Sequence, residues 1–283
     1  MITFRQTNSA DRTSAHDVSQ MVISPLQAGN LLQEIQQSGS IREFLFEMTK
    51  DGHVYWIGAA VPAGTTDYSK VQVFFHPTVV QNGHVHAKDT DYRTFTGGWS
   101  GSLQRYVAMQ GGQLAGARKT ALIVPFMTMA AATGRAPDYM FATKSAETLN
   151  SIMTAVRDAV TPSGAAPPAT APVQVSRVAV SSFSSGIGFM RLFIGTFGGT
   201  GLIVETTDFD SPFIIAEKNK PMTRSPGAKG RVFSQVGPVH PQSGWVTMPI
   251  ASFRNIPTFR DKGPHAQIGW MMFFTASMGS ALN

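Results

Sequence analysis

The stretch that decides the fold runs from Val173 to Gly199 and reads VQVSRVAVSSFSSGIGFMRLFIGTFGG. It begins with an apolar run that carries valines at 173, 175, 178 and 180, which is typical of a buried strand. Small residues then favour a tight turn, and the apolar run from Ile187 onward is typical of a helix. The sequence therefore predicts a short strand, a tight turn and a helix in direct succession.

This layout matches a nucleophile elbow, in which a nucleophile lies on a strained turn between a strand and a helix. Here the turn is Ser182-Phe183-Ser184-Ser185-Gly186, and Ser184 occupies the position of the nucleophile. The positions two before and two after it must be small, because a larger side chain would collide with neighbouring backbone. Ser182 and Gly186 meet that requirement, although Ser182 stands where the motif usually has glycine.

The same turn also resembles the cofactor-binding turn of short-chain dehydrogenases, TGxxxGIG, in which glycines let a pyrophosphate approach a helix N-terminus. Three features oppose this alternative. Ser182 replaces the first glycine, the turn lies well past the middle of the chain, and no tyrosine follows Tyr139 to supply the Tyr-x-x-x-Lys of that family. A nicotinamide-dependent reductase is therefore the weaker interpretation, and a plain strand–turn–helix with an idle serine is a further one.

Composition limits the class of protein. The chain has 283 residues, of which 42% are apolar and 14% charged, as expected of a globular protein with a large core. It has no cysteine, and its net charge of +6 comes from scattered Lys and Arg, so we expect no nucleic-acid partner. No apolar run reaches membrane-spanning length. The polar N-terminus lacks a signal core, so we expect a cytoplasmic protein, with export by a route other than Sec as the alternative.

The order of elements predicts one main domain. Residues 1–38 are expected to form a loosely docked arm and a helix after Pro25, and residues 39–283 a single domain with a short Pro/Ala-rich loop at 161–172. Strands are predicted at 41–49, 54–61, 70–75, 120–129, before Ser184, at 201–205 and at 231–236. Helices are predicted at 96–118, at 143–160, after Gly186 and at 266–282, with coil at 237–262.

These elements predict an α/β fold with a central, mostly parallel sheet, an antiparallel N-terminal hairpin and helices on both faces. In such a sheet the ligand site lies at the carboxyl ends of the strands. The elbow turn, His76-Pro77, Asp208 and the loop before His265 all follow predicted strands or precede the last helix, so we expect them to converge.

From Ile41 to the C-terminus the chain resembles the α/β-hydrolase family. The resemblance lies in the elbow around Ser184, the opening hairpin, a histidine just ahead of the last helix and the chain order serine, acid, histidine. It implies an α/β-hydrolase-like fold and a catalytic triad.

The resemblance implies that Ser184 is the nucleophile and His265 the base, with His240 as the alternative base. The family's acid usually follows the second strand after the elbow strand, but no carboxylate is found there. We therefore expect the acid after the strand that directly follows the elbow strand, and choose Asp208, with Asp210 as the alternative. This departure leaves a Ser–His dyad open.

The oxyanion hole is expected to use the N–H groups of Ser185 and Thr78, since Pro77 has none. His76, Phe126 and Met127 are candidate residues of an apolar pocket, with a place in the core as the alternative.

The preferred function is a serine esterase or lipase that cleaves a small-molecule or lipid ester without a cofactor. A non-catalytic, hydrolase-like binding scaffold is the main alternative. A metal-dependent hydrolase is a lesser one, because His84 and His86 lie near Asp89 and Asp91 at ligand-like spacing. We expect a solvated polar loop there and no metal.

Overall fold

The computed structural model describes most of the predicted domain. Its described residues are 1–12, 40–77, 80–81, 84–85, 104–127, 139–143, 145–161, 171–248, 265, 268–269, 273, 276–277 and 279–282. The predicted helix after Pro25 lies outside these residues.

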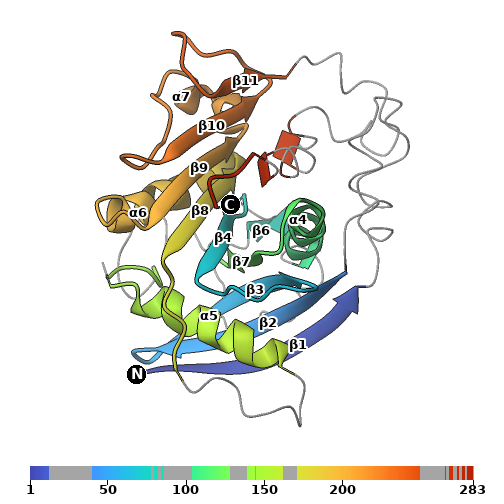
Figure 1. The fold of residues 1–283 in the computed structure, drawn as a ribbon. Coiled ribbons are helices and arrows are strands. Elements are labelled where there is room, and N and C mark those ends of the chain that lie inside the picture. Colours follow the sequence, from blue (N-terminus) through green and yellow to red (C-terminus); the bar gives the residue numbers. More distant parts are fainter. Residues whose placement is uncertain are drawn as a thin grey trace.

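A single mixed sheet of nine strands organises the described residues (Figure 1). Its order is β1-β2-β3-β7-β4-β8-β9-β10-β11, and a separate two-stranded ladder pairs β5 with β6. The first four strands in this order pair antiparallel, and every later pair is parallel. The strands are β1 (Ile2–Arg12), β2 (Ile41–Lys50), β3 (His53–Pro62), β4 (Lys70–Phe75), β5 (Val80–Gln81), β6 (His84–Val85), β7 (Ala121–Pro125), β8 (Arg177–Phe183), β9 (Ile203–Phe209), β10 (Lys229–Ser234) and β11 (Trp245–Thr247).

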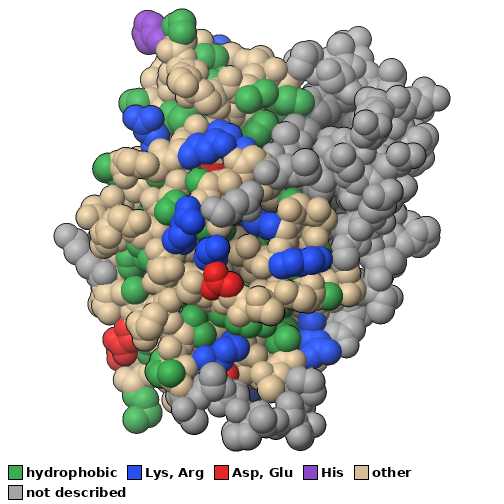
Figure 2. All heavy atoms as spheres, viewed as in Figure 1, with side chains coloured by type: hydrophobic (Ala, Val, Ile, Leu, Met, Phe, Trp, Pro, Cys, Tyr) green, Lys and Arg blue, Asp and Glu red, His purple; other side chains and the backbone are tan. Residues whose placement is uncertain are grey.

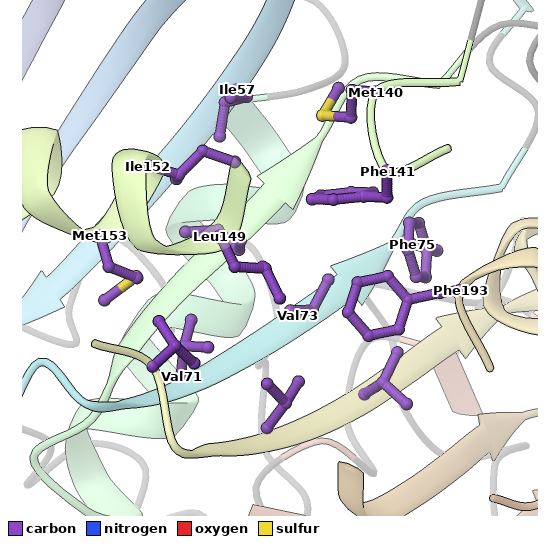
Figure 3. Packing of buried hydrophobic residues seen from close by; sticks show 14 of the residues in the cluster. Ile57, Val71, Val73, Phe75, Met140, Phe141, Leu149, Ile152, Met153 and Phe193 are labelled. Carbon is purple, nitrogen blue, oxygen red and sulfur yellow. The ribbon is translucent and has the colours of Figure 1, made fainter. Parts of the chain in front are cut away.

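Helices cover both faces of this sheet. The α-helices that can be bounded within the described residues are α4 (Gln104–Ala117), α5 (Glu147–Val160), α6 (Ile187–Phe197) and the single turn α7 (Ile215–Lys218). Buried side chains of α5 and α6 pack on one face, as Figure 3 shows for Leu149, Ile152 and Phe193 against Val71 and Val73. Side chains of α4 and of the C-terminal segment form a second cluster on the other face. This arrangement confirms the predicted α/β-hydrolase-like fold class.

The alternation of apolar residues explains why β4 can bury both of its faces. Val71, Val73 and Phe75 belong to the cluster under α5 and α6, and Phe74 belongs to the cluster under α4. A central parallel strand that is covered on both sides needs apolar side chains on both faces, and the buried polar residue Gln72 donates a hydrogen bond to Ser181 Oγ (3.1 Å).

The expectation of a loosely docked N-terminal arm is wrong for residues 2–12, which form the edge strand β1. This strand pairs with β2 along its whole length, with one bulge between Gln6 and Asn8. The ring of Phe4 contacts the edge of Phe46 at a centroid distance of 6.4 Å, and Arg5 forms an ion pair with Glu47. The polar composition beyond Phe4 concealed the strand, because an edge strand has little apolar surface to bury.

The predicted hairpin is confirmed, and its turn residues Asp51 and Gly52 both have positive φ (52° and 82°), as a tight two-residue loop requires.

Several elements have bounds that differ from the predicted ones. Strand β9 ends at Phe209 instead of residue 205, and β11 lies within the segment 237–262 that was expected to be coil. The last helix is helical at His265 and at later described positions up to residue 277, but residues 279–282 are not helical.

The elbow turn packs directly against the end of β4. Strand β8 lies parallel to β4, with Ser182 beside Phe75, and the turn Ser184–Gly186 leads into α6. A Cβ atom at Gly186 would lie 2.4 Å from the carbonyl oxygen of Phe75 and 2.9 Å from that of His76. Only glycine fits there, because both obstacles are backbone atoms that cannot move aside.

The substitution Gly186→Ala tests this contact. We expect it to lower the free energy of unfolding by about 1–3 kcal/mol, as overpacking in a core does. Gly188→Ala, two residues further on in α6, is the matched control, since no atom outside its chain neighbours and its own helix backbone lies within 4 Å of its Cβ position. That control should be neutral or stabilise by up to about 1 kcal/mol. Urea unfolding of both variants checks the prediction, and equal stabilities would contradict it.

Candidate active site

The backbone at Ser184 is strained. Its φ is 53°, and among the described residues Asp51, Ser184 and Asp210 are the only non-glycine residues with positive φ. Such a conformation costs about 1–3 kcal/mol and persists where the surrounding structure imposes it. Here the tight contact of Gly186 with the end of β4 holds the turn, and Ser184 remains partly exposed at the carboxyl end of β8.

The imidazole of His265 lies between Ser184 and Asp210. Its Nε2 atom is 2.9 Å from Ser184 Oγ, and its Nδ1 atom is 2.8 Å from Asp210 Oδ2. An ionised carboxylate can only accept a hydrogen bond, so Nδ1 carries the proton and donates a hydrogen bond to Asp210. The lone pair on Nε2 then faces the Ser184 hydroxyl, and this geometry suits removal of its proton.

Asp210 is held by a full set of hydrogen bonds. Its carboxylate is completely buried, and Oδ1 accepts hydrogen bonds from Ser234 Oγ (2.6 Å) and from the N–H of Gln235 (3.0 Å). Oδ2 accepts one from Gln235 Nε2 (2.7 Å) in addition to the one from His265. Because each oxygen has two donors, the buried charge is compensated and its orientation is fixed.

The sequence-based choice of Asp208 as the partner of His265 is wrong in the structure, which places Asp210 there. Asp208 instead accepts hydrogen bonds from the N–H (3.1 Å) and the hydroxyl of Ser211. The reason is the length of β9. The strand was expected to end at residue 205, which made Asp208 the nearer carboxylate, but it continues to Phe209. Asp208 therefore lies inside the strand, and Asp210 is the first residue beyond it.

Asp210 then turns the chain with a left-handed backbone, at φ 58° and ψ 32°. This turn leads into a short 3-10 helix, η5 (Ser211–Phe213).

Of the two candidate oxyanion donors, the structure describes one. Ser185 follows Ser184 in the turn, and Thr78 lies outside the described residues. Their role as donors stays a prediction.

His76 joins the ends of β4 and β7. Its Nδ1 atom donates to the Pro77 carbonyl (2.7 Å), and its Nε2 atom accepts from the N–H of Met127 (3.1 Å). Its ring stacks on Phe126 at a centroid distance of 5.3 Å. Burial lowers the pKa of His76 from 6.5 to about 4, so the ring is neutral near pH 7. All three candidate pocket residues, His76, Phe126 and Met127, are buried, and their place at a substrate pocket stays a prediction.

The remaining candidates are His240 and the residues considered for a metal site. His240 is exposed, and His265 occupies the position next to Ser184. His86, Asp89 and Asp91 lie outside the described residues, as does the side chain of His84. Within the part of the chain that the structure describes, no group of three or more His, Asp or Glu residues could hold a metal ion. The same part contains no helix long and apolar enough to cross a membrane.

The Gly186 contact also bears on the cofactor-turn alternative. The backbone carbonyls of Phe75 and His76 occupy the space beside this glycine. Carbonyl oxygens repel the oxygens of a phosphate, so this side of the turn is unsuited to a pyrophosphate.

On the face shown in Figure 2, the described Lys and Arg side chains occupy several separate places and form no single continuous patch.

A cavity of about 820 Å³ lies elsewhere, between β1 and α5. Its lining includes Ile2, Phe4 and Thr154, but no residue of the Ser184 cluster. Four strands of the sheet separate β1 from the elbow strand β8.

The mixed sheet, the strained strand–turn–helix and the chain order Ser184, Asp210, His265 define an α/β-hydrolase-like fold. No family model and no curated protein matches the chain.

Solved structures similar to the chain include three hydrolases, all at low identity. An S-formylglutathione hydrolase from Agrobacterium tumefaciens has 10% identity and a TM-score of 0.33, over 60% of this chain and 57% of that one. A thermostable esterase from Pseudomonas putida has 13% identity and a TM-score of 0.35, over 75% and 58%. Lipase A of Candida antarctica, in its closed state, has 10% identity and a TM-score of 0.34, over 76% and 45%. The chain thus spans about half the length of the structures it matches.

The pKa of Asp208 yields a prediction about stability. Burial raises this pKa from 3.8 to about 7, and the charge of Asp210 adds to the rise while the hydrogen bonds from Ser211 oppose it. The stability that Asp208 contributes is therefore fully present below about pH 4 and is lost as the pH rises through about 7. A rise of about three pKa units corresponds to about 4 kcal/mol.

Asp208→Asn removes this titration and can keep both contacts with Ser211. We expect the stability of Asp208→Asn, relative to the original protein, to increase steadily from pH 4 to pH 8, by up to about 4 kcal/mol. Urea unfolding of both proteins at several pH values measures the difference. A constant difference across this range would show that the carboxyl does not titrate there.

Proposed function

We propose that the protein is a serine esterase that cleaves carboxylic esters through an acyl-enzyme. The observation that carries the proposal is the unbroken chain of contacts from Ser184 Oγ to His265 (2.9 Å) and from His265 to Asp210 (2.8 Å). A serine hydroxyl becomes an effective nucleophile only when a base takes its proton, and an imidazole serves best when a carboxylate fixes its tautomer.

The proposed reaction has two halves. Ser184 Oγ attacks the ester carbonyl while its proton passes to His265 Nε2, and the resulting oxyanion is stabilised by the N–H of Ser185 and, as expected from the sequence, of Thr78. The tetrahedral intermediate collapses, and the alcohol leaves with the proton from His265. In the second half His265 takes a proton from water as its oxygen attacks the acyl-enzyme. The intermediate then releases the carboxylic acid, and His265 returns its proton to Ser184 Oγ. Asp210 orients the imidazole and stabilises its positive charge throughout.

An apolar acyl group is the proposed substrate feature. Phe213 lies beside His265 and is 52% exposed, so it offers aromatic surface close to the reacting groups. This supports esters with hydrophobic groups over highly charged substrates.

Labelling with a fluorophosphonate separates this proposal from the non-catalytic scaffold. We expect one adduct per chain on Ser184, measured by intact-protein and peptide mass spectrometry, and no adduct in Ser184→Ala. A reagent of this kind reacts with a serine only when a base activates it. Absence of labelling in the folded protein would favour a scaffold that binds without catalysis.

The two neighbouring aspartates offer a matched pair of variants. We expect Asp210→Asn to lower kcat by about a thousand- to ten-thousandfold, because the amide favours the wrong imidazole tautomer. Asp208→Asn should keep kcat near that of the original protein, since the amide can keep both contacts with Ser211 and Asp208 makes no hydrogen bond with His265. Hydrolysis of p-nitrophenyl butyrate measures both. The reverse pattern would restore Asp208 as the acid and overturn the assignment of Asp210.

A further inference from the structure

Two phenyl rings pack on the ring of His265. Phe183, the residue before Ser184, lies at a centroid distance of 4.8 Å with an interplanar angle of 35°. Phe213 lies at 4.3 Å with an angle of 23°, which is a stacked arrangement. Neither phenylalanine was predicted from the sequence as part of the site, because the contact joins segments far apart in the chain.

The two phenyl rings are held in different ways. Phe183 is buried, and its ring lies so close to Gly269 that a Cβ atom there would be 2.5 Å away. Phe213 is 52% exposed. Because about half of the Phe213 side chain is exposed, burial alone does not hold it beside His265. The turn that carries Phe213 must hold it there.

That turn is anchored to both aspartates. Asp208 accepts hydrogen bonds from the backbone and hydroxyl of Ser211, the first residue of η5. The N–H of Phe213 donates to the carbonyl oxygen of Asp210 at 3.2 Å. Pro212 between them is buried and has a fixed φ. Asp210 therefore holds Phe213 through its backbone carbonyl and His265 Nδ1 through its carboxylate.

The stack restrains a motion that the hydrogen bonds leave free. The contacts with Ser184 and Asp210 both lie in the plane of the imidazole, so they resist rotation out of that plane only weakly. Phenyl rings packed on the imidazole at 4.8 and 4.3 Å oppose that rotation and cover part of the imidazole from water. Misplacement of a catalytic group by about 1 Å can reduce a rate about a hundredfold.

We propose that Phe213 is a positioning residue for His265. With Phe183 it forms an aromatic clamp around the imidazole, and Asp208, through Ser211, fixes the turn that carries the exposed half of the clamp. This inference rests on the proposed esterase function, since the clamp matters only if His265 transfers protons.

The test uses three variants and a small ester, p-nitrophenyl acetate, which reaches little beyond the reacting groups. We expect Phe213→Leu to lower kcat by about ten- to a hundredfold with little change in KM, because Leu is apolar but cannot stack. Phe213→Tyr should recover most of the lost kcat. Ile215→Ala is the matched control, because Ile215 is also apolar, 87% exposed and only two residues further along the chain. Its kcat and KM should both be unchanged.

A second readout does not depend on activity. Proton NMR detects the Nδ1–H of His265 as a downfield signal, assigned by its loss in His265→Gln. We expect the signal in the original protein, Phe213→Tyr and Ile215→Ala, and its loss or broadening by exchange with water in Phe213→Leu.

The outcomes are distinguishable. An unchanged kcat and an unchanged downfield signal in Phe213→Leu would overturn the clamp while leaving the esterase intact. A change in KM alone would make Phe213 a substrate contact instead of a positioning residue. If the original protein shows the downfield signal but neither hydrolyses the ester nor reacts with a fluorophosphonate, the proposed function fails, and the NMR comparison alone decides whether the clamp exists.

Discussion

The close contact between the elbow turn and the end of β4 is the constraint on which the site depends. Gly186 lies against the carbonyl oxygens of Phe75 and His76, so the turn cannot relax away from its strained backbone at Ser184. The neutral His76 ring in turn joins the ends of β4 and β7 through Pro77 and Met127. Core packing of the parallel strands therefore fixes the direction of a single hydroxyl, which is how a rigid scaffold can preorganise a reacting group.

Two buried aspartates, two residues apart, have separate tasks set by their surroundings. Asp210 has four hydrogen-bond donors, one of them on His265, and these compensate its buried charge. Within the described part of the chain, Asp208 accepts from the two donors of Ser211, and burial raises its pKa to about 7. The first is suited to holding an imidazole and the second to anchoring the turn that follows. One strand end thus supplies both the acid of the proposed triad and the support for the aromatic ring beside it.

Much of the fold was predictable because it follows from local pattern. The hairpin, the buried central strands and the inward face of α5 are visible in apolar periodicity, and the small residues around Ser184 indicate the elbow. Ser184 and His265 were chosen from the motif and from its place before the last helix, and the structure brings them together. The choice between Asp208 and Asp210 depended on where β9 ends, and strand ends leave a weak signal when polar residues such as Thr206 and Thr207 continue the pairing. Phe213 was not predictable, because a stack between distant segments leaves no local pattern.

The most direct test of the central claim is to trap the acyl-enzyme. The protein is mixed with p-nitrophenyl acetate, quenched in acid within the first turnover and digested with trypsin, which releases residues 178–191 as one peptide. The account predicts one acetyl group on this peptide, located on Ser184 by fragmentation, together with a burst of one nitrophenol per chain. Steady hydrolysis with no acetyl group on Ser184, or acetylation that persists equally in His265→Gln, would contradict it.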